Sequence, residues 1–400
     1  MYGSASGASA ALERRKLRVS DITPSAEQAA AINSIVEWYG QKDRDEFYLA
    51  GYAGVGKSTI ARLAIEDIRD RYGVDTVRTA AYTGKAASVL RKKGIEDAST
   101  IHSLIYTPKL DEDTGELKFI LSEESGAAEA DLIVLDECSM IDDRLASDLR
   151  SFGKKILVMG DPGQLPPVNG QGAFTRSEPD VFLQEIHRQC ADSPIIELAT
   201  LIRQGLPIPT DFRKGGVEVI PLTKSSQELI YRDDTQAICG LNRVRWTYTQ
   251  RMRARKGFAG VHPLPGERII CCKNNKTLGL FNGGMGILVT GGGAIAGDRE
   301  VYSLSVHMDD EPEPHEGMKT DPYLFANHFT NGTSKRIENV KPALNEFDWG
   351  SVITCHKAQG SAWDHVTIVD DSHAFRENRR KWLYTAVTRA ETGLTLLMRD

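Results

Sequence analysis

An eight-residue run constrains this chain more than any other stretch, because both its spacing and its flanks are restrictive. Residues 51–58 read Gly-Tyr-Ala-Gly-Val-Gly-Lys-Ser and fit the phosphate-loop pattern G-x-x-x-x-G-K-[ST]. The apolar run 47–50 predicts a buried strand before it, and apolar residues at helical spacing over 59–71 predict a helix after it. In that setting, backbone N–H groups and a helix N-terminus hold phosphate oxygens. The sequence therefore predicts a nucleoside triphosphate site rather than an unliganded glycine turn.

Residues of this loop and of the helical turn after it have expected roles. Lys57 is expected to reach the β- and γ-phosphates, and the hydroxyl of Ser58 is expected to bind Mg²⁺. Backbone groups around them would hold the remaining phosphate oxygens. The residues assigned to ATP here are Ala53, Gly54, Val55, Gly56, Lys57, Ser58 and Thr59.

Composition limits the class of protein. With 400 residues, 40% of them hydrophobic and 26% charged, the chain is typical of a soluble globular protein of several domains. It has no apolar run that could span a bilayer, and residues 1–10 lack the apolar core of a secretory signal, so we expect a cytoplasmic protein. The six cysteines predict reduced thiols, and no pattern implies a metal beyond Mg²⁺. A net charge of −6 implies that any nucleic-acid contact is confined to a groove.

Two further apolar runs end in polar side chains. Residues 132–135 lead into Asp136 and Glu137. The first carboxylate is expected to hold Mg²⁺, and the second to orient and deprotonate an attacking water, which favours ATP hydrolysis. Residues 157–159 lead into a proline-rich loop in which Gln164 is placed to sense the γ-phosphate.

Alternating strands and helices predict an α/β fold with a parallel sheet. The expected strands of the first half are 47–50, 76–82, 132–135 and 156–159. A polar turn at 111–116 between two apolar runs predicts an inserted β-hairpin. A second α/β pattern begins near residue 190, and the glycine-rich stretch 263–340 predicts a small β-barrel inserted into it.

Short motifs follow one another along the chain in a fixed order. Besides the phosphate loop they are residues 23–28, 82–87, 100–104, 136–140, 160–167, 185–189, 354–361 and 383–390. Together they resemble the motifs of superfamily 1 DNA helicases of the RecD-like branch, and the compact length with an inserted hairpin is most similar to the Dda helicases of phages. The resemblance implies two RecA-like parallel-sheet domains of the P-loop NTPase fold, and an SH3-like β-barrel inserted in the second. The implied boundaries are a disordered tail at 1–20, domain 1A at 21–106 and 126–182, the hairpin 1B at 107–125, domain 2A at 183–262 and 346–400, and the barrel 2B at 263–345.

The resemblance also assigns roles to single residues. Gln28 would recognise adenine, with Thr23 as the cap of the helix that carries it, and Gly360 would contact the nucleotide. Arg188 and Arg389 would be arginine fingers at the γ-phosphate. The residues expected to contact DNA are Thr83, Gly84, Lys85, Thr100, His102, Phe119, His356 and Lys357. For His102 a buried core histidine stays an open alternative, and the basic run 243–256 fits either a phosphate-contacting helix or a solvated face.

The implied function is ATP-dependent 5′→3′ translocation on single-stranded DNA with unwinding of duplex. Expected substrates are single-stranded DNA and forked or 5′-tailed duplexes, with a monomeric protein, no membrane partner, and a single-strand-binding or replication protein as a candidate partner. The inserted hairpin would act as a pin at the fork, or is a surface hairpin without a role. A DNA-stimulated ATPase that remodels protein–DNA complexes with little unwinding stays open. The residues assigned to catalysis are Lys57, Asp136, Glu137, Gln164, Arg188 and Arg389.

Overall fold

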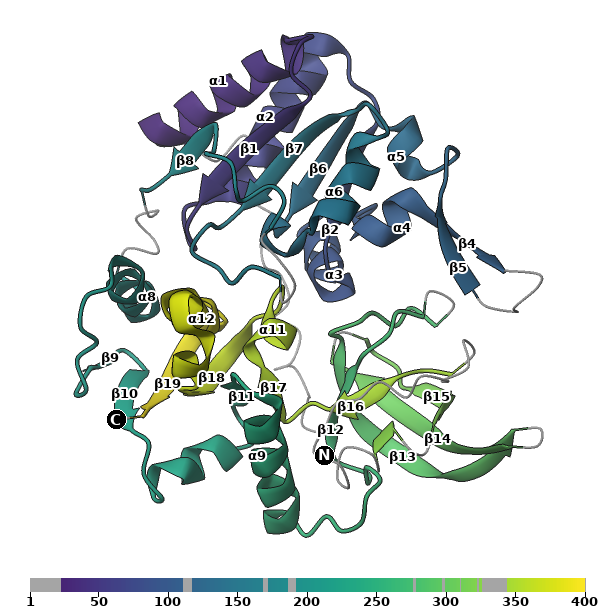
Figure 1. Ribbon diagram of the computed structural model, residues 1–400, viewed down its shortest axis with the longest axis vertical. Coiled ribbons are helices and arrows are strands. Elements are labelled where there is room, and N and C mark those ends of the chain that lie inside the picture. Colours follow the sequence, from purple (N-terminus) through teal and green to yellow (C-terminus); the bar gives the residue numbers. More distant parts are fainter. Residues whose placement is uncertain are drawn as a thin grey trace, which may run out of the picture.

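The computed structural model describes residues 23–110, 117–167, 172–185, 192–275, 278–296, 299–309, 311–321, 324–325 and 344–399. These residues form two six-stranded sheets, one five-stranded sheet and a two-stranded hairpin. In Figure 1 the first sheet lies at the top with its helices, the second lies below it on the left, and the five-stranded sheet lies below on the right. No helix among the described residues is long and apolar enough to cross a membrane.

The first sheet is parallel throughout, in the order β3-β2-β6-β7-β1-β8. Its strands are β1 (Glu46–Gly51), β2 (Val77–Ala81), β3 (Ser99–Thr100), β6 (Leu132–Asp136), β7 (Lys155–Gly160) and β8 (Val181–Leu183). Its helices are α1 (Ala26–Gly40), α2 (Lys57–Tyr72), α3 (Gly84–Lys92), α4 (Ile101–Ile105), α5 (Gly126–Glu129) and α6 (Asp143–Arg150). The strands expected from the apolar runs are confirmed, because strands covered by helices on both faces are apolar along their whole length.

The second sheet has the order β17-β11-β18-β19-β10-β9 and is parallel except for its edge strand β9. Its strands are β9 (Arg213–Lys214), β10 (Val217–Pro221), β11 (Gln236–Cys239), β17 (Val352–Thr354), β18 (Trp363–Val369) and β19 (Ala390–Met398). The helices with it are α8 (Pro194–Gln204), α9 (Asn242–Arg255), α11 (Cys355–Ala358) and α12 (Arg379–Val387). In Figure 1, α8, α11 and α12 lie on the side of this sheet that faces the first one.

An antiparallel sheet is inserted between α9 and β17, in the order β15-β14-β13-β12-β16. Its strands are β12 (Arg268–Cys271), β13 (Met285–Ala296), β14 (Arg299–Met308), β15 (His315–Thr320) and β16 (Phe347–Trp349). An isolated bridge links Thr320 of β15 to Asn345, which precedes β16. Closure of this sheet into a barrel stays a prediction. The implied start of domain 2A at residue 346 falls too early, because Phe347 and Trp349 are buried in the core of the inserted sheet and β16 pairs with β12.

The hairpin predicted between α4 and β6 is confirmed and consists of β4 (Tyr106–Leu110) and β5 (Leu117–Leu121). Its turn at 111–116 lies outside the described residues. Phe119 is 61% exposed, Ile120 44% and Leu121 42%, so consecutive apolar side chains of β5 face solvent. Because successive side chains of a strand point to opposite faces, both faces of this hairpin expose apolar surface.

Candidate nucleotide site and nucleic-acid interface

The phosphate loop, the acid pair and the Gln164 loop meet at one edge of the first sheet. They follow β1, β6 and β7, and the carboxyl ends of parallel neighbours lie at the same edge. Gly54 and Gly56 have φ angles of 82° and 86°, which glycine adopts without a steric cost. Lys57 Nζ donates to the carbonyl oxygens of Gly51 (2.7 Å) and Tyr52 (3.1 Å), so the amine lies over the loop that would cradle the phosphates.

The start of helix α1 corrects one expectation and supports the loop. Ser25, not Thr23, is the N-cap: its hydroxyl accepts from Gln28 N, and Gln28 Oε1 accepts from Ser25 N. This reciprocal capping box needs a Gln or Glu three residues after the cap, and Ser25 meets that spacing. Gln28 Nε2 also donates to the carbonyl oxygen of Val55 at 3.1 Å. Gln28 thus ties the helix to the phosphate loop, and its contact with adenine stays a prediction.

Asp136 and Glu137, the acid pair at the end of β6, combine a left-handed backbone at Glu137 with a desolvated carboxylate at Asp136. Glu137 has a φ of 56°, a left-handed conformation shared among the described non-glycine residues only by Arg376. Such strain is concentrated at functional sites. Loss of water raises the pKa of Asp136 to about 6, and the neighbouring Glu137 adds to this while Lys57 opposes it. A bound cation would offset the free energy cost of keeping the desolvated Asp136 carboxylate charged. The oxygen atoms of Asp136 and Ser58 are donors that Mg²⁺ prefers, so these residues fit the predicted ion.

The loop after β7 is held by the second sheet. Leu165 N donates to Thr385 Oγ1 at 2.8 Å, and Gln359 Nε2 donates to the carbonyl oxygen of Leu165 at 3.0 Å. Gln164 is buried, and its Oε1 atom has no hydrogen-bond partner in the described part of the chain. A buried acceptor without a donor is costly, so a ligand group that donates to Gln164 would bind favourably.

Two residues that contact the phosphate loop were missed by sequence reasoning. The guanidinium of Arg203, at the end of α8, lies 3.7 Å from the ring centre of Tyr52. The hydroxyl of Tyr384, in α12, accepts from Ala53 N at 2.9 Å. An aromatic residue at the second position of the loop was the available signal for the first contact. Both contacts join the second sheet to the nucleotide site.

Arg389, one of the two candidate arginine fingers, is held by acceptors within its own domain. Arg389 is buried and donates to the carbonyl oxygens of Thr385 (3.1 Å) and Ser361 (3.2 Å) and to Thr388 Oγ1 (3.2 Å). These acceptors all belong to the second sheet and its helices, so contact with a phosphate requires Arg389 to exchange partners. Arg188 lies outside the described residues.

The residues expected to contact DNA on the first sheet occupy helix starts. Thr83 caps α3 by accepting from Ala86 N (3.1 Å), and Thr100 caps α4 by accepting from Ser103 N (3.1 Å). Thr100 is buried, so its side chain supports the helix rather than facing solvent. His102 is exposed, with its ring 6.4 Å from that of Tyr82 and 5.6 Å from that of Tyr106. The core-histidine alternative for His102 is therefore wrong.

Parts of all three sheets meet at Gly84 and Gly360. A side chain at Gly84 would clash with Phe281 of the inserted sheet, and the Arg91 guanidinium lies 4.8 Å from the Phe281 ring centre. A Cβ at Gly360 would lie 2.9 Å from Thr83 Oγ1. Gly360, expected at the nucleotide, is thus placed beside the candidate DNA-binding residues. Lys85 also lies here, because a Cβ at Gly283 would be 3.5 Å from the Lys85 Cβ.

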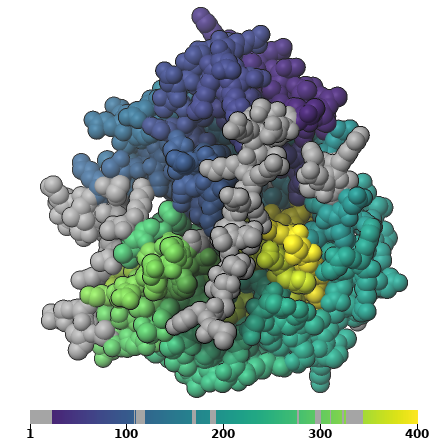
Figure 2. All heavy atoms as spheres, turned by 180° about the vertical axis from the view of Figure 1, so that it is seen from behind, coloured from purple at the N-terminus to yellow at the C-terminus, as the bar shows by residue number. Residues whose placement is uncertain are grey.

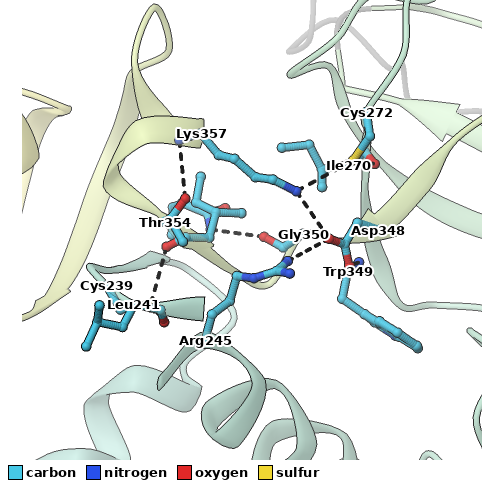
Figure 3. A network of polar contacts seen from close by, with 12 residues as sticks. Cys239, Leu241, Arg245, Ile270, Cys272, Asp348, Trp349, Gly350, Thr354 and Lys357 are labelled. Carbon is cyan, nitrogen blue, oxygen red and sulfur yellow. Dashed lines mark hydrogen bonds and ion pairs between the residues drawn. The ribbon is translucent and has the colours of Figure 1, made fainter. Parts of the chain in front are cut away.

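Lys357 takes part in a network of ion pairs (Figure 3). Lys357 Nζ lies 3.1 Å from Asp348 Oδ2, and Arg245 Nη1 lies 2.8 Å from the same oxygen. The side chains of Arg245 and Asp348 are 1% and 5% exposed, whereas that of Lys357 is 35% exposed. The network joins α11 and α9 to β16 of the inserted sheet. Its neighbour His356 lies with its ring 5.8 Å from that of Phe375, and burial lowers the pKa of His356.

Asp348→Ala is expected to lower the free energy of unfolding by about 3–5 kcal/mol, because Arg245 is left as an unpaired buried charge. Urea unfolding followed by tryptophan fluorescence measures it, since Trp246 and Trp349 lie in the same core. The matched control is Asp309→Ala, which breaks the partly exposed pair with Arg268 and is expected to cost less than about 1 kcal/mol. Equal losses in the two variants would contradict the prediction.

Most cations of the basic helix α9 are paired within the protein. The carboxylates that they contact come from the inserted sheet and from residues 228–233. The pairs are Arg245 with Asp348, Arg253 with Glu267, Arg255 with Glu228 and Lys256 with Asp233. Arg251 donates to Gln227 Oε1 at 3.0 Å, and Arg243 is exposed. These pairings favour a structural role for the helix over a row of phosphate contacts.

Known proteins share this architecture. Residues 23–214 match the AAA domain family, and residues 350–397 match the UvrD-like helicase C-terminal domain. The ATP-dependent RecD2 DNA helicase of Deinococcus radiodurans is 27% identical over 366 residues, covering 86% of this chain and 45% of that protein. The ATP-dependent DNA helicase Pif1 of Campylobacter jejuni is 24% identical and is covered to 88%, as is this chain.

Solved structures agree in fold. Crystal structures of a Bacteroides Pif1, with single-stranded DNA alone or with ADP-AlF3 as well, superpose with a TM-score of 0.54 at 21% and 20% identity. They cover 94% of this chain and 92% of theirs. The chain spans less than half of the RecD2 relative, so that protein's remaining segments have no counterpart in this comparison. In its ordered motifs, its two family matches and its fold, the chain is similar to superfamily 1 helicases of the group that contains the RecD-like and Pif1-like proteins.

Proposed function

We propose that the chain is an ATP-driven motor that moves 5′→3′ along single-stranded DNA and unwinds duplex DNA. The observation that carries this proposal is the composite nucleotide site. The phosphate loop and the Gln164 loop belong to the first sheet, but Tyr384, Thr385 and Gln359 of the second sheet hydrogen-bond to them. A nucleotide bound between them would change the spacing of the two sheets, as a motor requires. The relatives named as RecD2 and Pif1 DNA helicases support DNA as the track.

The residues of the site divide the chemistry of hydrolysis among them. Lys57 would bind the β- and γ-phosphates, and Glu137 would accept the proton of the attacking water as the new P–O bond forms. Mg²⁺, held by Ser58 and Asp136, would neutralise charge on the phosphates. The proton acceptor and the cation ligand are adjacent in sequence, and the backbone at Glu137 is left-handed.

Stabilisation of the transition state would come from the second sheet. Arg389 is buried beside Tyr384 and Thr385, and it must leave carbonyl acceptors to reach the γ-phosphate. Charge that develops on the phosphoryl oxygens would replace those weaker acceptors, because a charged pair is stronger than a bond to a neutral carbonyl. Closure of the two sheets would thus be favoured by ATP and reversed after hydrolysis.

The DNA would pass where the three sheets meet. Gly84, Lys85 and Gly360 lie there, with the exposed His102 ring close to Tyr82 and Tyr106. Exposed rings of this kind stack on bases of any sequence. Both nucleotide-binding halves are present in one chain, so we propose that a monomer suffices. A single-strand-binding protein would supply the track rather than complete the site.

Direction is tested with duplexes that carry a single-stranded tail at one end only. We expect unwinding of the 5′-tailed duplex and at most trace unwinding of the 3′-tailed one, measured by release of a fluorescent strand in ATP and Mg²⁺. Preferential unwinding of the 3′-tailed substrate would overturn the polarity. ATPase stimulated by single strands without strand release from either substrate, combined with displacement of a bound protein, would instead establish a remodelling translocase.

A further inference from the structure

One phenol hydroxyl lies between two loops of the nucleotide site. Tyr384 belongs to α12 of the second sheet, yet its hydroxyl donates to Asp161 Oδ2 at 2.7 Å and accepts from Ala53 N at 2.9 Å. Ala53 is in the phosphate loop after β1, and Asp161 opens the loop after β7. A single atom of the second sheet therefore contacts both loops at the edge where the γ-phosphate is expected.

Packing leaves this hydroxyl little freedom. Tyr384 is buried and Asp161 is 3% exposed. A Cβ at Gly163 would lie 3.0 Å from Tyr384 Cε1, so the ring lies directly against a residue that must stay small. The Tyr52 ring meets it edge-on at 6.4 Å. With water excluded, loss of either hydrogen bond would leave a buried polar group unsatisfied, so the two bonds fix the spacing of the loops.

Asp161 also positions the loop that carries Gln164, through two further hydrogen bonds. Asp161 Oδ1 accepts from Gly163 N at 2.9 Å, and the Asp161 carbonyl accepts from Gln164 N at 3.1 Å. The next residue, Leu165, is held by Thr385 and Gln359. Both loops of the nucleotide site therefore contact α12, so a movement of α12 relative to the first sheet would shift or break these hydrogen bonds.

We propose that Tyr384 is a positioning residue for ATP hydrolysis, whose hydroxyl sets the distance between the phosphate loop and the Gln164 loop. It acts through Ala53 and Asp161 and does not itself react. The proposal rests on the proposed ATPase function. It explains why a second-sheet tyrosine is oriented by two first-sheet groups rather than by its own helix.

The test is Tyr384→Phe in the full chain, which keeps the ring against Gly163 and removes only the hydroxyl. We expect kcat for ATP hydrolysis with saturating oligo-dT to fall about tenfold. The Kd for a fluorescent ADP analogue should change less than about twofold, because the other loop donors remain. Amide exchange of the 50–56 segment should become faster, as Ala53 N–H loses its acceptor.

The matched control is Tyr48→Phe. Tyr48 is a buried tyrosine of β1 whose pKa is raised by burial and, to a smaller extent, by Asp161, but its hydroxyl makes no hydrogen bond in the described part of the chain. This variant should keep kcat and exchange at wild-type values. A second test is Asp161→Asn, which keeps Oδ1 as the acceptor for Gly163 N but replaces Oδ2, the acceptor of the Tyr384 hydroxyl, by an amide NH2. Added to Tyr384→Phe it should lower kcat no further, because both changes break the same contact.

Three results would overturn the proposal: an unchanged kcat in Tyr384→Phe, an equal loss in Tyr48→Phe, or additive losses in the double variant. An inactive wild type would overturn the proposed function and this proposal with it. A fully active Tyr384→Phe beside an active wild type overturns the role of Tyr384 alone. If Tyr384→Phe unfolds, the Asp161→Asn variant decides, since wild-type kcat there would exclude the contact.

Discussion

Glu137→Gln is expected to bind ATP with near wild-type affinity and to hydrolyse it at least about a hundredfold more slowly, because the amide cannot accept the proton of the attacking water. The substitution keeps the size of the side chain and the left-handed backbone. Single-turnover hydrolysis of labelled ATP with oligo-dT measures the chemical step, and a fluorescent nucleotide measures binding.

The control for this prediction is Glu46→Gln, which changes a partly exposed carboxylate paired with Arg150 in the same domain. We expect its turnover to match the wild type. DNA-stimulated turnover of Glu137→Gln within a few-fold of wild type would show that another group activates the water. Weak ATP binding in that variant would instead indicate that Glu137 helps to hold the metal.

Replacing residues 107–121 with a short Gly-Ser linker is expected to abolish most duplex unwinding while ATPase stimulated by single strands survives. The replaced segment carries the exposed Phe119, Ile120 and Leu121. It follows α4, whereas the loops of the nucleotide site follow β1, β6 and β7. Tyr106, whose hydroxyl hydrogen-bonds Asp148, stays in place and preserves the base of the hairpin. Strand release from a fork and ATPase on oligo-dT are measured in parallel.

A single substitution tests the contribution of the Phe119 ring to unwinding. Phe119→Ala should slow unwinding about tenfold, since stacking of an aromatic ring on a base contributes about 1–3 kcal/mol. The control is Leu206→Ala, an apolar residue of the second domain that is also exposed to solvent. If unwinding persists at wild-type rates in both hairpin variants, strand separation occurs at another surface and the hairpin is not the pin.

The sequence predicted the sheets and the loops that carry the nucleotide site, because both depend on local spacing. An apolar run ending in Asp136 and Glu137 predicts a strand with two carboxylates whatever surrounds it. It does not predict the left-handed backbone at Glu137, which depends on how the next turn packs. The phosphate loop and the hairpin were found for the same local reason.

What the sequence could not predict depends on contacts between distant segments. Lys357 has the residue type of a phosphate contact, but Asp348 lies close enough to pair with it only after the inserted sheet has folded. The implied domain boundary at residue 346 placed Phe347 and Trp349 with the second domain, whereas both are buried in the core of the inserted sheet. Tyr384 lies 223 residues from Asp161, so no local pattern marks their hydrogen bond.

The internal pairing of cations bears on how binding would respond to ionic strength. A cation that docks on a DNA phosphate releases a condensed counterion, and each such contact on a single strand steepens the logarithmic salt dependence of affinity by about 0.7. Arg245, Arg253 and Lys357 already face carboxylates of this chain. They would release no counterion unless those pairs break. The proposed affinity for DNA should therefore be less sensitive to added salt than the forty-nine lysines and arginines of the chain suggest. It should depend more on ring stacking and hydrogen bonds, which persist when salt screens charge. Seen from behind in Figure 2, the purple and blue residues of the first domain lie above the green and teal residues of the rest of the chain.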